Sequence, residues 1–209
     1  MNARLGALAT LLFCGIAYLL LGLAVAHAPP HGFDLAARAL VGEAPHLALL
    51  FTASCWWPAL VTFGVLELVL AARSPAWRGR ALSAVAIMLV GWRVSDALKD
   101  IFMRPRPEYW ILHHETSYAY SSGHAMFAVI VYFLWAVFVW RSDLPQTFRR
   151  IATPLLTLWG CGVIWSRLAL GAHYPSDLLG GALLGCALLA AGVLITSIPL
   201  PPAKLIIAS

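Results

Sequence analysis

The sequence contains few charged residues: only 11% of its 209 positions are Asp, Glu, Lys or Arg, whereas 61% are hydrophobic. Soluble domains carry about 25% charged residues, so this composition excludes an ordinary water-soluble fold. The apolar runs provide room for six membrane-spanning helices of roughly 20 residues each. We predict an all-α, six-transmembrane-helix bundle, with spans near 5–27, 47–71, 79–101, 122–141, 148–169 and 176–198.

Cysteine is also scarce, and its distribution excludes a disulfide framework or a cysteine metal site. The four cysteines all fall inside predicted spans, where they are expected to pack as small apolar residues; they are Cys14, Cys55, Cys161 and Cys186. The chain lacks linkers, repeats and low-complexity segments. We therefore expect one integral membrane domain over 1–209, with its core motifs at about 90–185.

The first apolar run has one alternative interpretation, a secretory signal peptide. The sequence Val25-Ala26-His27-Ala28 resembles a small-residue cleavage site. However, the run of about 22 apolar residues is longer than the usual 7–15 of a signal peptide. We expect a retained helix, and cleavage would leave the later topology unchanged.

The net charge of +5 follows the predicted loops and does not indicate a nucleic-acid partner. One group of cations lies at the termini and in or beside the second and fourth loops: Arg4, Arg73, Arg78, Arg80, Arg141, Arg149, Arg150 and Lys204. The other group lies in or beside the odd loops: Arg38, Lys99, Arg104, Arg106 and Arg167. The positive-inside rule places the first group and both termini in the cytoplasm. The odd loops are then expected to face the periplasm or exterior from the cytoplasmic membrane.

The first cluster of outward cations is Lys99 with Arg106, where the third span leaves the membrane. Pro105 and Pro107 favour an extended path that could return Arg106 toward the helix end. An ammonium and a planar guanidinium both suit a phosphate, although a snorkelling interfacial pair is the alternative. In the same region, Asp100 and Arg104 stand at the spacing of a helix ion pair.

The second cluster, Ser122-Gly123-His124, opens the fourth span. A helix start presents unpaired N–H groups and a positive dipole end, which favour an anion. Ser122 can cap the helix or donate its hydroxyl, Gly123 permits close approach to the backbone, and His124 could protonate a leaving oxygen. An ordinary serine cap followed by a packed histidine is the alternative.

The third cluster places Arg167, His173 and Asp177 at spacings of six and four residues. Pro175 suits the first position of the last helix, which puts Asp177 in its first turn. A carboxylate there can accept a hydrogen bond from one imidazole nitrogen of His173 and leave the other free to attack phosphorus. Ionisable groups beside a bilayer are functional candidates because burying them is costly.

Together the clusters resemble the three signature motifs of the type 2 phosphatidic acid phosphatase superfamily, in its integral membrane lipid phosphatase branch. Those motifs are Lys-x6-Arg-Pro, Pro-Ser-Gly-His and Ser-Arg-x5-His-x3-Asp. The corresponding segments begin here at Lys99, Ser121 and Ser166. Order, spacing and position relative to the spans agree. One departure is Ser121, which stands where the family usually has proline and leaves the start of the fourth helix uncertain.

The resemblance implies a metal-independent phosphatase without a cofactor, acting on a lipid phosphate or diphosphate among membrane lipids. It implies that His173 is the nucleophile that forms a phosphohistidine, that Asp177 orients it, and that His124 is the general acid. The phosphoryl oxygens would be held by Lys99, Arg106, Ser122, Gly123 and Arg167. Candidate substrates are undecaprenyl diphosphate, phosphatidylglycerol phosphate, phosphatidic acid and lipid A phosphates.

Two other functions remain alternatives. A lipid phosphotransferase would use the same phosphohistidine but pass the phosphoryl group to another lipid. A transporter or non-catalytic scaffold would be supported best by Glu67, a lone acid inside the second span, although pairing with Arg73 or a neighbouring helix also explains this residue.

Two further segments are interpreted from the sequence alone. We interpret the sequence at 113–115, which is His-His-Glu, as loop residues without a metal. We interpret 34–42 as a short interfacial helix.

Overall fold

In the computed structural model, the described residues are 3–108 and 117–196, and all regular structure within these ranges is helical, which confirms the all-α prediction. The first part contains α1 (Ala3–Val25), α2 (Phe33–Ala36), the 3₁₀ turn η1 (Ala37–Leu40), α3 (Pro45–Ala53), α4 (Trp57–Arg73) and α5 (Pro75–Phe102). The second contains α6 (Gly123–Phe127), the π-helical turn η2 (Ala128–Phe133), α7 (Leu134–Trp140), α8 (Gln146–Ala169) and α9 (Pro175–Thr196).

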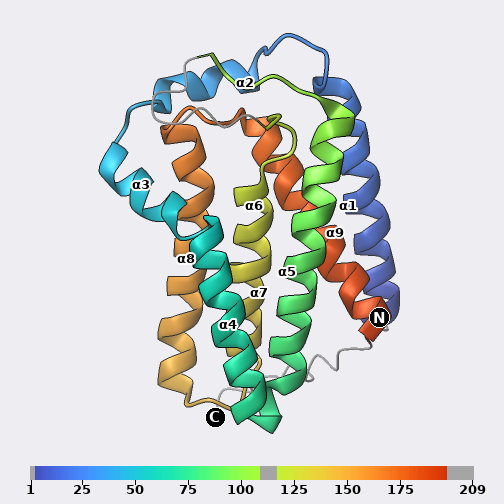
Figure 1. Ribbon diagram of the computed structural model, residues 1–209, viewed down its shortest axis with the longest axis vertical. Helices are drawn as coiled ribbons and strands as arrows, with labels where there is room; N and C mark the ends of the chain where they lie inside the picture. The colour runs from blue at the N-terminus through green and yellow to red at the C-terminus, as the bar shows by residue number, and fades with distance from the viewer. Residues whose placement is uncertain (1–2, 109–116, 197–209) are drawn as a thin grey trace, which may run out of the picture.

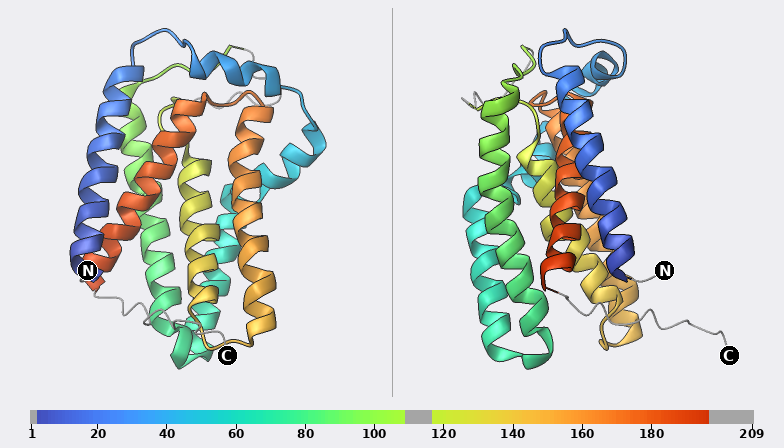
Figure 2. Two further views of the ribbon diagram at one scale, coloured as in Figure 1. Left: turned by 180° about the vertical axis from the view of Figure 1, so that it is seen from behind. Right: turned by 90° about the vertical axis from the view of Figure 1, so that its right-hand side faces the viewer.

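The long helices stand side by side, so the chain alternates between two ends of one bundle (Figures 1 and 2). Helix α1 packs on α9, α4 on α5, α3 on α8, and α7 on α8. The connections after α1, α5 and α8 meet at one end, which also carries α2 and which we call the site end (top of Figure 1). The connections after α4 and α7 lie at the opposite end.

Five continuous helical runs in the described chain are long and apolar enough to cross a membrane: α1, α5, α6–η2–α7, α8 and α9. The second predicted span, 47–71, is instead the pair α3 and α4, which are bent by 42° at a short break. The prediction of six spans therefore holds for five continuous runs, and a sixth span exists if the bent pair is counted as one.

The break between α3 and α4 has a physical cause in Pro58, which lies in the first turn of α4. Proline has no N–H, so the carbonyl of Ser54, four residues earlier, cannot receive a helical hydrogen bond. The Tyr132 hydroxyl donates to that carbonyl at 3.1 Å, and the Trp159 indole N–H donates to Ser54 Oγ at 2.9 Å. Neighbouring helices thus satisfy polar groups that a membrane would otherwise leave unpaired.

The start of the fourth span does not depend on the proline that Ser121 replaces. Helix α6 begins at Gly123, and the N-cap hydroxyl of Ser122 accepts the Ala125 N–H at 3.4 Å. On α9, Gly181 lies so close to the Ser122 carbonyl that any Cβ there would collide with it. Capping and the close approach of α9, which a small residue permits, together hold this helix start.

The intramembrane acid Glu67 is accounted for by a neighbouring helix. It is buried on α4, and the Trp135 indole N–H on α7 donates to its Oε1 at 2.6 Å. A hydrogen-bonded carboxyl group between two helices fits the structural explanation of this residue. Glu67 therefore gives no support to a transporter.

The helical segment predicted at 34–42 is present as α2 and η1, which lie across the site end (Figure 1). Leu35 and Leu40 are exposed there, as an interfacial helix requires. Asp34, by contrast, is buried and turns toward the bundle. This segment therefore covers the site end and also contributes a charge to its interior.

Candidate active site

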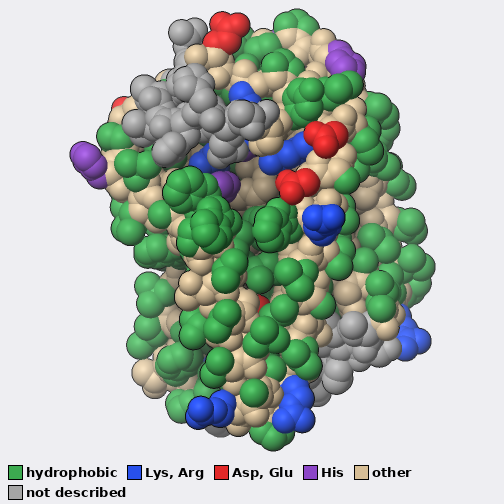
Figure 3. Space-filling model, in the orientation of Figure 1, with side chains coloured by type: hydrophobic (Ala, Val, Ile, Leu, Met, Phe, Trp, Pro, Cys, Tyr) green, Lys and Arg blue, Asp and Glu red, His purple; other side chains and the backbone are tan. Residues whose placement is uncertain are grey.

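The site end gathers the predicted functional residues from several elements. Lys99 lies in the last turn of α5, Ser122 caps α6, and Arg167 lies in the last turn of α8. His173 lies in the connection between α8 and α9, and Asp177 in the first turn of α9. Basic, acidic and histidine side chains border a hollow near this end, above a largely apolar face (Figure 3).

His173 and Asp177 form the buried centre of the site. Nδ1 of His173 lies 3.5 Å from Oδ2 of Asp177, and Nε2 lies 3.2 Å from NH1 of Arg106. A guanidinium can only donate, so the contact at Nε2 requires a lone pair there and assigns the ring proton to Nδ1. The geometry favours a neutral imidazole with its proton toward the carboxylate and its nucleophilic lone pair toward a cation.

The surroundings of His173 also oppose its protonation. Burial lowers the pKa of His173 well below 6.5, and Arg106, Arg167 and Lys99 lower it further. Burial removes the water that would solvate an imidazolium, and the three cations repel it. The ring is therefore neutral at pH 7 in the unliganded protein.

Arg106 reaches the site from the non-helical segment that follows α5, as the flanking prolines predicted. Its Nε donates to the Ser117 carbonyl at 2.8 Å, and its NH1 donates to the Ala172 carbonyl at 3.0 Å. Two backbone segments far apart in the sequence thus fix the plane of the guanidinium beside His173. These bonds hold the positive charge of Arg106 beside His173, where it favours a bound phosphate.

Arg167 and His124 are linked through Thr52, a residue of α3 that sequence reasoning missed. Arg167 is buried, and its NH1 donates to Thr52 Oγ1 at 2.7 Å. The Thr52 backbone also lies beside the His124 ring. Its Nε2 is buried and has no hydrogen-bond partner among the described residues. No local spacing indicates Thr52, because only the packing of α3 on α8 brings it to the site.

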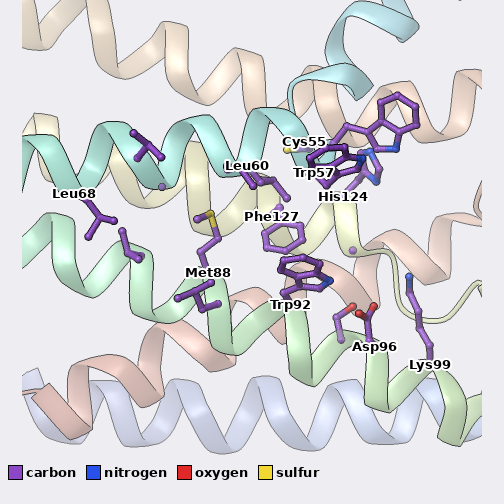
Figure 4. Close-up of a pocket in the computed structure, with 18 of the residues that line it drawn as sticks. Cys55, Trp57, Leu60, Leu68, Met88, Trp92, Asp96, Lys99, His124 and Phe127 are labelled. Atoms are coloured by element: carbon purple, nitrogen blue, oxygen red, sulfur yellow. The ribbon is translucent and has the colours of Figure 1, made fainter.

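A cavity of about 460 Å³ runs from these residues along α4 and α5 (Figure 4). Lys99, Gly123, His124 and His173 line its polar end. The lining along α5 extends from Val85 to Lys99, about 21 Å at 1.5 Å per residue. The rest of the wall is largely apolar; it includes Trp57, Leu60, Leu68, Met88 and Phe127. The groove thus joins a cationic end to a long apolar channel.

Arg104 does not form the helix pair with Asp100 that their spacing suggested. Helix α5 ends two residues earlier, and Met103 adopts a left-handed conformation with φ of 48° that turns the chain. Arg104 is buried and forms ion pairs with Asp34 and Asp177. Neither Arg104 nor Asp34 was among the predicted site residues, because the two residues lie 70 positions apart and no local spacing connects them.

Within 3–108 and 117–196, no group of three His, Cys, Asp or Glu side chains is placed to hold a metal ion. The four cysteines, all within these ranges, are free thiols. The residues at 113–115, interpreted as loop residues, lie outside the described part of the chain.

The bundle and its site define a helical membrane protein with a buried His–Asp pair among cations at the end of an apolar groove. Residues 80–198 match the PAP2 superfamily, and the chain belongs to this family. The match covers every predicted site residue and omits α1–α4.

Two curated relatives and one solved structure are similar to the chain. Phosphatidylglycerophosphatase B of Escherichia coli (strain K12) is 38% identical over 86 residues, 40% of this chain and 32% of the relative. Phosphatidylglycerophosphatase B of Bacillus subtilis (strain 168) is 35% identical over 100 residues, 46% of this chain and 47% of the relative. The aligned segments thus span less than half of each relative.

The crystal structure of a transmembrane PAP2 type phosphatidylglycerolphosphate phosphatase from Bacillus subtilis shares the fold. Its TM-score is 0.64 at 24% identity, over 88% of this chain and 94% of that one. Unlike the family match, this likeness extends over most of the chain. It supports the arrangement of the helices that surround the motif region.

Proposed function

We propose that the protein is a membrane-embedded phosphatase that hydrolyses a lipid phosphate monoester or diphosphate through a phosphohistidine on His173. One observation carries this proposal. The lone pair on Nε2 of His173 faces Arg106, while the Nδ1 proton faces the buried Asp177. A neutral histidine held between a cation and a carboxylate is suited to attack phosphorus among bound phosphoryl oxygens.

In the first step, NH1 of Arg106 turns from Nε2 of His173 to a phosphoryl oxygen, Nε2 bonds to phosphorus, and the bond from phosphorus to the leaving oxygen breaks. Positive charge develops on the imidazole, and Asp177 stabilises it through the Nδ1 proton. The cations that lower the pKa of the free ring, Lys99, Arg106 and Arg167, now neutralise the equatorial oxygens. Stabilisation of this kind is usually the largest contribution to catalysis.

In the second step, water attacks phosphorus, the bond to His173 breaks, and inorganic phosphate leaves. His124 serves both steps: as an imidazolium beside the bound phosphate, its Nε2 donates a proton to the leaving oxygen, and the neutral ring then accepts a proton from water. The buried, unpartnered Nε2 of His124 supports this role, since a bound substrate would supply the missing partner. Ser122 holds the start of α6, and the Gly123 backbone lines the cavity beside the phosphate.

We propose that the site faces the periplasm or exterior. The site end carries the His–Asp centre, whereas the connections after α4 and α7, with the arginines of the second and fourth loops, lie at the other end (Figure 1). The positive-inside rule orients such a bundle with the arginine-rich end in the cytoplasm. A lipid head group would then reach the site sideways from the outer leaflet.

The substrate class can be tested directly by phosphate release from purified wild-type protein in detergent. The panel is phosphatidylglycerol phosphate, undecaprenyl diphosphate, phosphatidic acid and a lipid A phosphate. The names of the two relatives make phosphatidylglycerol phosphate the first choice. Release of phosphate from none of these lipids would contradict the proposal.

Filling the apolar groove is expected to weaken binding of long-chain lipids selectively. A Cβ at Gly64 would lie 3.1 Å from Met88 Cε, at the terminus of a flexible side chain that lines the groove. Gly64→Leu should raise KM for a long-chain lipid phosphate about 10-fold, which corresponds to losing burial of roughly two methylenes. Turnover of water-soluble p-nitrophenyl phosphate should change less than about twofold, because that substrate leaves the groove empty.

The matched control for the groove is Gly15→Leu, because a Cβ at Gly15 on α1 meets no atom within 4 Å. This variant adds the same side chain at a helix position away from the cavity. An equal rise in KM for both variants, or an equal loss with both substrates, would show that the groove does not hold the lipid chain.

The depressed pKa of His173 predicts that its ring stays neutral as the pH falls through 6.5. Because the folded state disfavours the proton, this group favours folding above its ordinary pKa and opposes folding as the pH drops further. Nitrogen NMR of labelled histidine in the unliganded protein should show a titration midpoint for His173 below 6.5. In Arg106→Gln the midpoint should rise, because one repelling cation is gone. A wild-type midpoint at or above 6.5 would contradict the assigned electrostatics.

A further inference from the structure

Asp34 lies outside the segment that matches the family, yet its carboxylate is the hub of a buried network. Its Oδ2 accepts from NH2 of Arg104 at 2.7 Å, and its Oδ1 accepts from the Ser176 N–H at 3.0 Å. The Ser176 hydroxyl lies 2.7 Å and 2.8 Å from the two carboxylate oxygens. Both oxygens are thus occupied by groups from the segment after α5 and from the first turn of α9.

Arg104 connects this carboxylate to the catalytic one. NH2 of its guanidinium binds Asp34, while NH1 binds Oδ1 of Asp177 and lies 2.7 Å from Ser176 Oγ. The planar group also lies over the Tyr174 ring at 4.6 Å. One rigid fork therefore holds two carboxylates at a fixed separation, which the point charge of a lysine could not do.

The network ends at the nucleophile. Oδ2 of Asp177 accepts the Tyr174 N–H at 2.9 Å and faces Nδ1 of His173 at 3.5 Å. Arg104 occupies the other oxygen, so the carboxylate of Asp177 cannot rotate without breaking a buried ion pair. The orientation of Oδ2 toward His173 thus depends on where Arg104 lies, and Asp34 fixes that position.

The charges of the buried network also support a role for Asp34 in orienting Asp177. In the buried network one guanidinium is shared by Asp34 and Asp177, so these three groups together carry one net negative charge when both carboxylates are ionised. Forming the phosphohistidine gives the imidazole a positive charge, which would balance the group. Without the Asp34 charge, Arg104 would neutralise Asp177 alone, and the carboxylate would stabilise the imidazolium less.

We propose that Asp34 is a positioning residue for phosphoryl transfer, through which the α2 segment sets the orientation and effective charge of Asp177 by way of Arg104. This inference rests on the proposed roles of His173 and Asp177. Asp34 does not line the substrate groove, so its loss should affect the chemical step and leave substrate binding intact.

The test compares two inhibitors of the Asp34→Asn variant in detergent. Vanadate can bond to a nucleophilic nitrogen in the five-coordinate geometry of the transition state, whereas inorganic phosphate binds only to the cationic pocket. The variant should lower kcat about 10- to 100-fold, raise the vanadate inhibition constant similarly, and leave KM and the phosphate inhibition constant within about twofold. Asn retains an acceptor for the Ser176 N–H, so the capping contact to α9 can survive.

Two further variants make the result decisive. Arg104→Lys keeps the charge but loses the fork, and it should show the same separation of vanadate from phosphate even if Asp34→Asn fails to fold. Glu43→Gln removes an exposed carboxylate that follows η1 in the sequence, and it should match wild type. If both inhibitors bind equally more weakly and the melting temperature falls, Asp34 serves fold stability alone and the proposal is overturned. Unchanged kcat and unchanged vanadate inhibition in Asp34→Asn would also overturn it.

The proposed function is checked separately, by trapping acid-labile phosphohistidine on wild-type protein. If wild type forms none, the phosphohistidine mechanism fails whatever the variants do. If wild type forms it and Asp34→Asn turns over normally, only the role of Asp34 fails.

Discussion

Replacing His173 by alanine is expected to abolish phosphate release from every lipid substrate, with a loss of at least about 10⁴-fold in kcat, as when other enzymes lose a nucleophile. No other described histidine combines a buried carboxylate at one ring nitrogen with a guanidinium at the other. Water alone would have to attack phosphorus in the variant, without the covalent intermediate. The measurement is phosphate release by purified protein, with phosphohistidine trapped in parallel.

The control is His27→Ala, which removes an exposed histidine between α1 and α2 and should leave turnover unchanged. The His173→Ala pocket keeps its three cations, so inorganic phosphate should still bind. Retention of more than a few per cent of wild-type kcat, or phosphohistidine in the variant, would show that His173 is not the nucleophile.

The spans were predictable because apolar length is a local property of the sequence. Five predicted runs agree with continuous helices to within a few residues, including 122–141 against 123–140. The break in 47–71 was missed although Pro58 marks it. Whether a membrane helix tolerates proline depends on a partner for the freed carbonyl, and that partner, the Tyr132 hydroxyl, comes from a segment far away in the sequence.

Motif spacing predicted which residues gather around His173, but it could not predict the residues that only the fold brings there. The spacing of Asp100 and Arg104 is that of a helix ion pair, which would require the helix to continue through Arg104. The left-handed Met103 ends α5 and sends Arg104 inward. Asp34 and Thr52 carry no motif and reach the site only through the packing of α2 and α3 over its end.

Replacing His124 by alanine is expected to separate substrates by their leaving groups. A lipid alkoxide is a poor leaving group unless it is protonated, so kcat/KM for a lipid monophosphate should fall about 10²–10⁴-fold without the general acid. The p-nitrophenolate ion departs without a proton, so kcat/KM for p-nitrophenyl phosphate should fall less than about 10-fold. The second step also loses its base, and phosphohistidine should therefore accumulate when p-nitrophenyl phosphate is the substrate.

The leaving-group comparison distinguishes an acid from a packed histidine at the helix start, which was the alternative for this position. A packing defect would lower both activities by the same factor and would not build up the intermediate. His46→Ala, an exposed histidine on α3, provides the control and should behave as wild type with both substrates. The buried Nε2 of His124 has no hydrogen-bond partner in the described chain, which leaves it available to a substrate or water. Only the acid–base role makes the loss of activity depend on the leaving group.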